Sequence, residues 1–404
     1  MVALQRDASF ERDVVVIGGC GHVGLPLAIA FADRGATVAV YDINPDAVAQ
    51  VSSGVLPFDE PRAARFLLRA VSGRRLCATT DPGVVATAAH VIVVIGTPVD
   101  EHLNPDQQAI TRALAGCARY LRDGQILILR STVYPGVTAL VEKMVARLGC
   151  SIDVAFCPER IAEGQAMTEL FELPQIISAR TEAAFERAGA LFGLLTAGQV
   201  RMTPEEAELA KLFTNAWRYI KFATANQLYM IANDRGLDFE RIRQGLMVDY
   251  PRAADLPGAG FAAGPCLLKD TMQLAAFNNN NFAIGHTAMA INEGLPLYLV
   301  DRLGRRYDLG SMAVGILGMA FKGGSDDTRS SLAYKLKGIL TFVTDTVYCT
   351  DPHVTTDPTL LPLEDVVEKS DLLIIAAPHR EYATLDTDKP VVDIWNIRGE
   401  GVRV

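Results

Sequence analysis

Residues 14–24, VVVIGGCGHVG, begin the stretch that decides the fold. The apolar, β-branched run 14–17 predicts a buried parallel strand, and residues 25–35, LPLAIAFADRG, follow with a helical period. A second strand is expected at 37–42, TVAVYD. Strand, glycine turn, helix, strand and final acid, in this order, are typical of a dinucleotide-binding unit.

Three glycines and one aspartate carry the binding chemistry of this unit. Gly19 allows the tight turn, Gly21 lets a pyrophosphate approach the backbone, and Gly24 lets the helix pack on the strand. Asp42 ends the second strand, where a carboxylate accepts from a ribose 2′-hydroxyl and repels a 2′-phosphate. We therefore expect NAD as the cofactor, in preference to NADP.

The composition is that of a large globular protein with more acidic than basic residues. A chain of 404 residues is too long for one core and predicts two or three domains. The net charge is −9 without a basic run, which argues against nucleic acid as the main partner. Residues 1–13 are polar and lack a signal core, and no apolar run reaches transmembrane length, so we expect no membrane association.

The cysteines and histidines indicate the redox environment of the protein and whether a metal is expected. The seven cysteines are odd in number and scattered, which is typical of reduced thiols and favours a cytoplasmic location. The six histidines show no ligand spacing with cysteine, so we expect no metal.

Polar residues follow several further predicted strands, which lie within 90–100, 125–136 and 151–164. Ligands of open parallel sheets bind at the carboxyl ends of the strands. The residues expected there, which predict a lined crevice, are Thr97, Thr132, Glu159 and Glu163. Each of them alone could instead be a helix cap or a solvated loop residue.

Residues 204–235 carry a long helical pattern, with Pro204 and two glutamates as a start signal and Gly236 as a stop signal. Such a helix suits a domain connector or a subunit interface. One of its faces carries the polar residues Glu208, Lys211, Asn215 and Arg218. This polar stripe either lines a site or is a solvated, salt-bridged face.

Residues 258–271, GAGFAAGPCLLKDT, offer a cysteine, a lysine and an aspartate close together. Gly264 with Pro265 predicts a sharp turn that exposes Cys266. The ammonium of Lys269 favours the thiolate, and the carboxylate of Asp270 can take or hold a proton. The alternative is a loop that enters a helix with a buried cysteine and two solvated charges.

The C-terminal part predicts a second α/β unit. Residues 312–331, MAVGILGMAFKGGSDDTRSS, contain a strand followed by a polar loop, and later strands are expected at 346–351, 372–378 and 390–395. The predicted fold class is α/β, with two Rossmann-like, doubly wound parallel-sheet domains joined by a long central helix and a helical dimerisation region.

These motifs, in this order, resemble those of the UDP-glucose 6-dehydrogenase family, the nucleotide-sugar dehydrogenases. The resemblance covers the chain from Val14 to about Asn396. It rests on the glycine turn with Asp42 and on the segments GTP, STVYPG, CPERIAEG, ELAKLFTN, GPCLLKD and GMAFKGGSDDTRSS. It implies a homodimer and three domains, namely an NAD-binding domain (1–203), a central helical domain (204–305) and a nucleotide-sugar-binding domain (306–404).

The resemblance implies a four-electron oxidation of a hexose C6 alcohol to the aldehyde and then to the carboxylate, with two NAD and one water. By this resemblance Cys266 attacks the aldehyde to form a thiohemiacetal, which is oxidised to a thioester that water cleaves. UDP-glucose is the expected substrate, since the segment CLLKD keeps a lysine that many N-acetylhexosamine relatives lack. UDP-N-acetylhexosamine, TDP-glucose and GDP-mannose stay open as alternatives.

The resemblance also assigns roles to other residues. Lys211 would stabilise an alkoxide at C6, with Asn215 as its hydrogen-bonding partner. Asp270 and Thr132 would hold a water as proton acceptor, and Glu159 would serve hydrolysis. The implied cofactor contacts, besides the glycine turn and Asp42, are Thr97, Thr132, Glu163, Lys269 and Arg329. The implied substrate contacts are Glu159, Lys211, Asn215, Arg252, Ala263 and Lys322, with Arg252 donated across a dimer interface.

Three positions depart from the family pattern. Ala263 stands where a glycine is usual beside the sugar, and His22 stands where tyrosine or phenylalanine is common. Residues 393–396 read DIWN in place of Asp-x-Arg-Asn, which leaves the nucleotide base open.

Two other functions remain possible from the sequence alone. A two-electron β-hydroxyacid dehydrogenase shares the domain order but needs no nucleophilic cysteine. A non-catalytic nucleotide-sugar binder is the second alternative, against which stands the joint presence of Cys266, Lys211, Asp270 and Glu159.

Overall fold

The computed structural model describes residues 8–97, 99–100, 106, 108–402 and 404. The N-terminal segment 1–7 and Pro98 of the GTP segment, both used in the sequence predictions, lie outside the described residues. The chain divides into two compact units, Met1–Phe213 and Thr214–Val404, and the division falls within helix α8 (Pro204–Asn233). The three-domain division stays a prediction.

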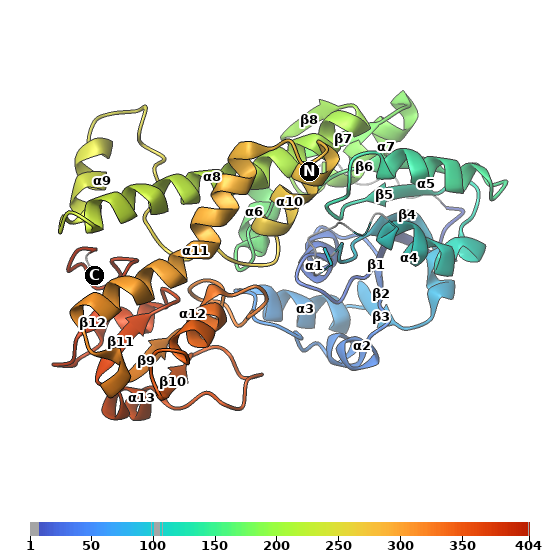
Figure 1. The fold of residues 1–404 in the computed structure, drawn as a ribbon. Coiled ribbons are helices and arrows are strands. Elements are labelled where there is room, and N and C mark those ends of the chain that lie inside the picture. Colours follow the sequence, from blue (N-terminus) through green and yellow to red (C-terminus); the bar gives the residue numbers. More distant parts are fainter. Residues whose placement is uncertain (1–7, 98, 101–105, 107, 403) are drawn as a thin grey trace. The chain divides into compact units, whose positions relative to one another are not determined.

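The first unit is built on an eight-stranded sheet with the order β3-β2-β1-β4-β5-β6-β7-β8 (Figure 1). Its strands are β1 (Arg12–Ile17), β2 (Val38–Tyr41), β3 (Leu76–Thr79), β4 (Ala88–Val93), β5 (Ile126–Leu129), β6 (Asp153–Phe156), β7 (Gln175–Ala179) and β8 (Gln199–Met202). Neighbours are parallel except β6 and β7. The strand order reverses between β1 and β4, where open α/β sheets bind ligands.

Helices cover both faces of this sheet, which explains why residues 14–17 of β1 form an unbroken apolar run. Helices α1, α3, α6 and α7 pack with Val14 and Val16, whereas α4, α5 and the start of α8 pack with Val15 and Ile17. The helices before α8 are α1 (Gly24–Asp33), α2 (Pro45–Ser52), α3 (Ala63–Ser72), α4 (Ala109–Cys117), α5 (Val137–Ala146), α6 (Ala166–Glu172) and α7 (Glu182–Phe192), with the short 3-10 helices η1 (Pro82–Thr87) and η2 (Ala118–Tyr120).

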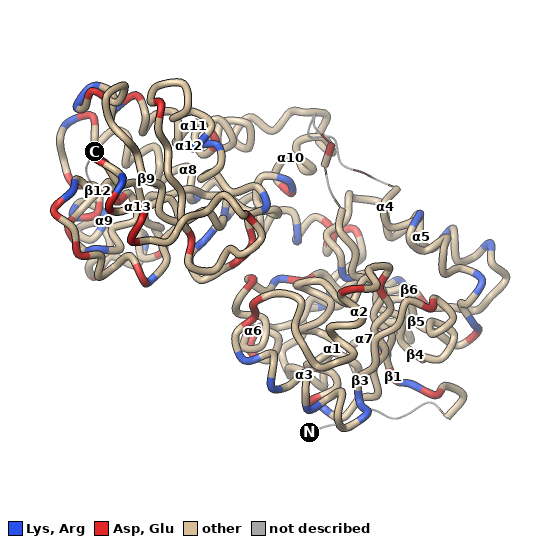
Figure 2. The backbone as a smooth tube through the Cα atoms, turned by 90° about the horizontal axis from the view of Figure 1, so that it is seen from below, with Lys and Arg blue, Asp and Glu red and all other residues tan. Residues whose placement is uncertain are grey.

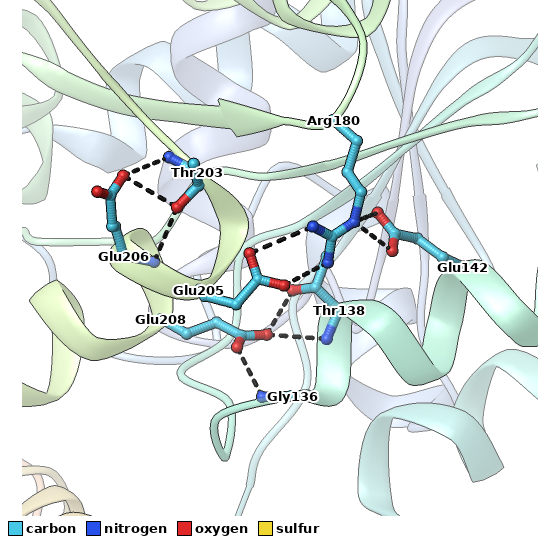
Figure 3. A network of polar contacts seen from close by, with 8 residues as sticks. All are labelled: Gly136, Thr138, Glu142, Arg180, Thr203, Glu205, Glu206 and Glu208. Atoms are coloured by element: carbon cyan, nitrogen blue, oxygen red, sulfur yellow. Dashed lines mark hydrogen bonds and ion pairs between the residues drawn. The ribbon is translucent and has the colours of Figure 1, made fainter.

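The start of α8 is fixed by a polar network (Figure 3). Thr203 and Glu206 form a capping box, in which the Thr203 N–H donates to Glu206 Oε2 over 2.8 Å. Glu208 is buried and accepts from the N–H of Gly136 (2.7 Å) and from the N–H (2.8 Å) and hydroxyl (2.6 Å) of Thr138, at the N-terminus of α5. This residue of the polar stripe is therefore not on a solvated face.

The second unit contains a four-stranded parallel sheet with the order β10-β9-β11-β12. Its strands are β9 (Ala313–Leu317), β10 (Thr346–Thr350), β11 (Leu372–Ile375) and β12 (Val391–Asp393). Its helices after α8 are α9 (Phe239–Met247), α10 (Leu267–Phe277), α11 (Ala283–Arg306), α12 (Leu332–Leu340) and α13 (Leu363–Lys369), with the 3-10 helices η3 (Leu309–Ser311) and η4 (Arg380–Thr384). Helices α11, α12 and the later turns of α8 share one core with the sheet, and α13 and η4 cover its other face.

Both units carry mixed charge. Figure 2 shows Lys and Arg (blue) interspersed with Asp and Glu (red) along the described backbone of each unit. Among the described residues, no helix has both the length and the apolar character that a membrane span requires.

Candidate active site

The glycine turn between β1 and α1 fits the backbone of a dinucleotide. A Cβ added at Gly24 would lie 2.7 Å from Gly19 Cα, so this glycine lets α1 pack on the turn. A Cβ at Gly19 would lie 2.8 Å from Val16 O, whereas one at Gly21 would meet only Gly18 O, at 4.0 Å. The open space at Gly21 is where a pyrophosphate can approach the backbone. The residues present thus fit NAD.

Asp42 connects the glycine turn to the end of β2. Its Oδ2 accepts from the N–H of Cys20 (3.0 Å), and its Oδ1 accepts from the N–H of Asn44 (3.1 Å). Asp42 is half-buried, and a carboxylate has further lone pairs, so it can still accept from a ribose hydroxyl. Burial, and next the charge of Asp42, raises the pKa of the Cys20 thiol to about 12, which disfavours its thiolate at neutral pH.

The ends of β4 and β5 bring Thr97 and Thr132 together. The two strands are neighbours in the sheet, and the hydroxyl of Thr97 donates to the carbonyl oxygen of Thr132 over 2.7 Å. The N–H of Ile95 donates to the hydroxyl of Ser131 over 2.8 Å in the same region. These contacts hold the two turns against one another at the carboxyl edge of the sheet.

Glu159 lies in a buried ion pair with Arg130. Arg130 Nε donates to Glu159 Oε2 over 2.9 Å, and its Nη2 contacts the same oxygen. The other oxygen, Oε1, accepts from the N–H groups of Arg160 (2.6 Å) and Ile161 (2.9 Å). Arg130 is fully buried and also donates to Gln175 Oε1. Together with these N–H contacts, the pair holds the turn after β6 in a fixed conformation.

Glu60 fixes the loop that carries Glu163. Its buried carboxylate accepts from the N–H groups of Gly164 and Ala166, both over 2.9 Å, at the start of α6. The sequence predictions missed Glu60 and gave no role to Arg130. An arginine directly after an apolar strand was a usable signal, because a buried guanidinium needs a carboxylate partner.

Lys211 and Asn215 lie one turn apart on α8, and both are buried. Within the second unit, the side-chain amide of Asn215 donates to Asp270 Oδ2 on α10 over 2.5 Å. Lys269 Nζ lies 2.8 Å from Asp270 Oδ1, and the Asp270 side chain is fully buried. The sequence-predicted residues Asn215, Lys269 and Asp270 therefore form one cluster.

Cys266 begins this cluster, as the N-cap residue of α10, and it is exposed. The N–H of Asp270 donates to the carbonyl oxygen of Cys266 over 2.9 Å, so the two lie one helical turn apart. The N-terminal end of a helix stabilises a thiolate. All seven cysteines are free thiols; burial raises the pKa of Cys157 to about 12 and that of Cys349 to about 11. Cys157 and Cys349 are buried, whereas the thiol of Cys266 is accessible.

The cysteine loop packs on two aromatic residues in loops that follow strands of the C-terminal sheet. A Cβ at Gly264 would lie 2.6 Å from the ring of Phe321, after β9, and one at Gly260 would lie 2.2 Å from the ring of Trp395, after β12. Gly264 also has a φ of +100°, which favours glycine. Ala263 is half-buried between these glycines.

The other predicted contacts lie at three places in the second unit. Lys322 Nζ lies 5.6 Å from the centroid of the neighbouring Phe321 ring. Arg329 forms an ion pair with Asp327, with 2.9 Å between Nε and each carboxylate oxygen. Arg252 is exposed in the turn after α9.

Among the described residues of the second unit, one group of side chains has the composition of a metal site. Ligand atoms of His353, His379 and Glu381 lie within 4.8 Å of one another. Both ring nitrogens of His379 are already hydrogen-bonded, to Asp351 and to the N–H of Gly324. The expectation of no metal stays a prediction.

A glycine turn that fits NAD, a second Rossmann-like sheet and a cysteine loop define the class of NAD-dependent dehydrogenases with a second ligand-binding domain. Three domain models of the UDP-glucose/GDP-mannose dehydrogenase family match the chain: the NAD binding domain over residues 12–196, the central domain over 205–294 and the UDP binding domain over 315–399. The chain belongs to this family and is an NAD-dependent nucleotide-sugar dehydrogenase, as its sequence predicts.

Relatives of the family match over nearly their full length. The UDP-N-acetyl-D-mannosamine dehydrogenase of Pyrococcus horikoshii is 31% identical, over 96% of this chain and 93% of its own. The NDP-N-acetyl-D-galactosaminuronic acid dehydrogenase of Ralstonia nicotianae is 28% identical, over 96% and 95%. The solved structure of a UDP-glucose dehydrogenase from Pyrobaculum islandicum is 28% identical, covers 99% of both chains and has a TM-score of 0.89. These matches confirm the predicted fold class.

Proposed function

We propose that this chain oxidises C6 of a UDP-hexose to the carboxylate through a covalent intermediate on Cys266. The observation that carries the proposal is the cluster in which Asp270, held by Asn215 and Lys269, lies one helical turn from the exposed Cys266. A thiol and a carboxylate so placed are the groups needed to form and resolve a thiohemiacetal.

Two NAD molecules, bound one after the other, would each accept one hydride. The residues of this chain supply the rest. Asp270 holds the proton released when the alcohol is oxidised, and the Cys266 thiolate adds to the resulting aldehyde. The sulfur–carbon bond persists through the second oxidation, and water then displaces the thiolate and releases the acid. We retain Thr132 as a partner of Asp270 toward water and Lys211 as the cation that stabilises the C6 alkoxide.

Glu159 remains the candidate for the hydrolysis step. Its carboxylate is held in place by Arg130, and a carboxylate so held can accept a proton from an attacking water. We likewise propose that Thr97, Glu163, Lys269 and Arg329 contact the cofactor. The proposed contacts to the nucleotide sugar are Arg252, Ala263 and Lys322.

The first candidate sugar is an N-acetylated hexosamine, since the relatives from Pyrococcus horikoshii and Ralstonia nicotianae carry such sugars in their names. UDP-glucose, the sugar expected from the sequence, is the second candidate. Lys269 supports it, as does the similarity to the UDP-glucose dehydrogenase structure.

The proposal is tested by offering UDP-N-acetyl-D-mannosamine, UDP-glucose, TDP-glucose and GDP-mannose and measuring the NADH formed per sugar consumed. Two NADH per sugar with one of the UDP-sugars supports the proposal. One NADH per sugar supports the two-electron alternative, and none with any sugar supports a binding protein.

We also propose a homodimer that forms along α8. Exposed apolar side chains recur on this helix at helical spacing, namely Phe213, Trp217, Leu228 and Ile231. Such a row on a long helix favours burial against a second copy. Ile231→Glu should give a monomer in sedimentation, with Arg235→Glu as the control; a monomeric parent protein would contradict the proposal.

The seven free thiols support a reducing location, so we keep the cytoplasm as the proposed compartment.

A further inference from the structure

A buried histidine and aspartate hold the loop that follows the central strand of the C-terminal sheet. This loop, residues 318–324, joins β9 to the segment before α12 and contains Phe321 and Lys322. Asp351 follows β10 and His379 follows β11, the two strands that flank β9. Both side chains are fully buried at the carboxyl edge of the sheet.

Asp351 fixes the first part of the loop. Its Oδ2 accepts from the N–H groups of Met319 (2.6 Å) and Ala320 (2.9 Å). Its Oδ1 accepts from the N–H groups of His353 (2.8 Å) and Val354 (3.0 Å). One carboxylate thus ties the loop after β9 to the turn after β10.

His379 fixes the end of the same loop. Its Nδ1 accepts from the N–H of Gly324 over 3.1 Å, and its Nε2 lies 3.0 Å from Asp351 Oδ2. Because Nδ1 acts as an acceptor, the ring proton lies on Nε2 and is donated to Asp351. Gly323 packs closely beside this bond, since a Cβ there would lie 2.2 Å from Pro378 O.

The loop held in this way reaches the cysteine loop within the same unit. The ring of Phe321 contacts Gly264, and the N–H of Gly264 donates to the carbonyl oxygen of Ser330 over 3.4 Å. Gly264 is two residues before Cys266. A shift of loop 318–324 would therefore be transmitted to the loop that carries the nucleophile.

We propose that His379 is a positioning residue for the nucleotide sugar, because its bond to Gly324 sets the conformation of loop 318–324 and thereby the place of Lys322. The inference rests on the proposed function, in which Lys322 contacts the nucleotide sugar. His379 acts through the loop and need not touch the ligand.

Two substitutions test separately the two hydrogen bonds that the His379 ring makes. Asparagine can place its side-chain oxygen near the position of Nδ1, so His379→Asn retains an acceptor for Gly324 and loses the bond to Asp351. Glutamine can place its amide near the position of Nε2, so His379→Gln retains the donor to Asp351 and loses the acceptor. His353→Gln is the control, since its ring lies beside His379, at 5.0 Å between centroids, and outside this loop.

The experiment measures the Kd of UDP and of NAD by titration calorimetry for the full-length parent protein and the three variants. We expect His379→Gln to raise the Kd of UDP about tenfold, which is the size of effect expected when the hydrogen bond from Gly324 is lost. His379→Asn and His353→Gln should stay within about threefold of the parent, and the Kd of NAD should be unchanged throughout.

Hydrogen–deuterium exchange of the peptide that covers loop 318–324 gives a second measurement without ligand. The His379→Gln protein should exchange faster there than the His379→Asn protein. Equal UDP affinity of parent and His379→Gln would overturn the inference and leave the proposed function intact, as would equal losses in both His379 variants. A parent protein that fails to bind UDP would contradict the proposed function as well.

Discussion

The side-chain amide of Asn215 on α8 donates to Oδ2 of Asp270 on α10 over 2.5 Å. This bond fixes one oxygen of a fully buried carboxylate, while Lys269 lies 2.8 Å from the other. A carboxylate held by two partners in a buried position keeps its orientation. Asp270 is thereby placed as the candidate proton acceptor one turn from Cys266.

Asp270→Asn removes the proton acceptor and retains the shape of the side chain. We expect kcat to fall by about 10²–10⁴-fold, the usual contribution of a positioned general base. The KM values for sugar and NAD should change little. Steady-state kinetics measure this, with Asp255→Asn as the control, since Asp255 is an exposed aspartate paired with Lys221. Turnover near the parent value would remove Asp270 from the proposed chemistry.

Asp42 should determine the choice between NAD and NADP. The parent protein should prefer NAD, because a 2′-phosphate would meet the carboxylate at the end of β2. Asp42→Asn retains an acceptor for the N–H of Cys20 and should reduce the ratio of kcat/KM for NAD over NADP about tenfold, equivalent to about 1.4 kcal/mol. Asp46→Asn, in the first turn of α2, is the control. A parent protein that uses both cofactors equally would contradict this role.

The network in Figure 3 makes a prediction about stability. Glu208→Gln replaces a carboxylate that accepts three hydrogen bonds from Gly136 and Thr138. A glutamine amide has one acceptor oxygen where the carboxylate has two, so its NH2 group would face a backbone N–H group. We therefore expect the free energy of unfolding to fall by about 1–3 kcal/mol. Glu205→Gln, in the same first turns of α8 but 54% exposed, should cost less than about 1 kcal/mol. Equal decreases of the thermal unfolding midpoint in the two variants would contradict the claim that Glu208 stabilises the fold more than Glu205 does.

The local contacts were predictable from sequence, and the long-range ones were not. The glycine turn and Asp42 lie within one βαβ unit, so their spacing identifies them. Strand β8 was missed because it has only four residues, QVRM, which is too short for a clear alternation, and most of them are exposed. Glu60 was missed because its partner Gly164 lies 104 residues later and its own segment has the composition of a solvated loop.

The cluster around Cys266 was predictable in part. The spacing of Cys266 and Asp270 on α10 follows from helical geometry. The bond from Asn215 joins residues 55 positions apart, and only the family resemblance pointed to both. No sequence signal indicated that His379 binds Gly324, because buried and exposed histidines look alike in a sequence.

Asp351 should make the stability of the protein depend on pH in the acid range. Burial would raise the pKa of Asp351, but the hydrogen bonds from His379 and from the N–H groups of Ala320 and His353 lower it from 3.8 to about 2. An aspartate with a lower pKa in the folded state stabilises the fold above its unfolded pKa and loses that effect as pH falls through the folded value.

Asp351→Asn should therefore cost about 2 kcal/mol at neutral pH, and its deficit relative to the parent should shrink as pH falls from about 4 to about 2. Thermal unfolding midpoints of both proteins across this range measure the effect. Asp345→Asn, an exposed aspartate near β10, should show a small and constant difference. A deficit for Asp351→Asn that does not change with pH would show that the ionised carboxylate is not the source of the stability.

Cys266→Ser tests the central claim most directly. A serine hydroxyl has a far higher pKa than a thiol, so it attacks an aldehyde poorly and leaves an ester poorly. After incubation with NAD and the preferred nucleotide sugar, mass spectrometry of the protein and the products should show a stalled reaction. The expected species are released aldehyde or a sugar-nucleotide mass on the protein, with turnover to the uronic acid reduced by several orders of magnitude and ligand affinities retained. Uronic acid formed by Cys266→Ser at a rate near that of the parent protein would show that the cysteine is structural and that oxidation through a covalent intermediate on Cys266 is wrong.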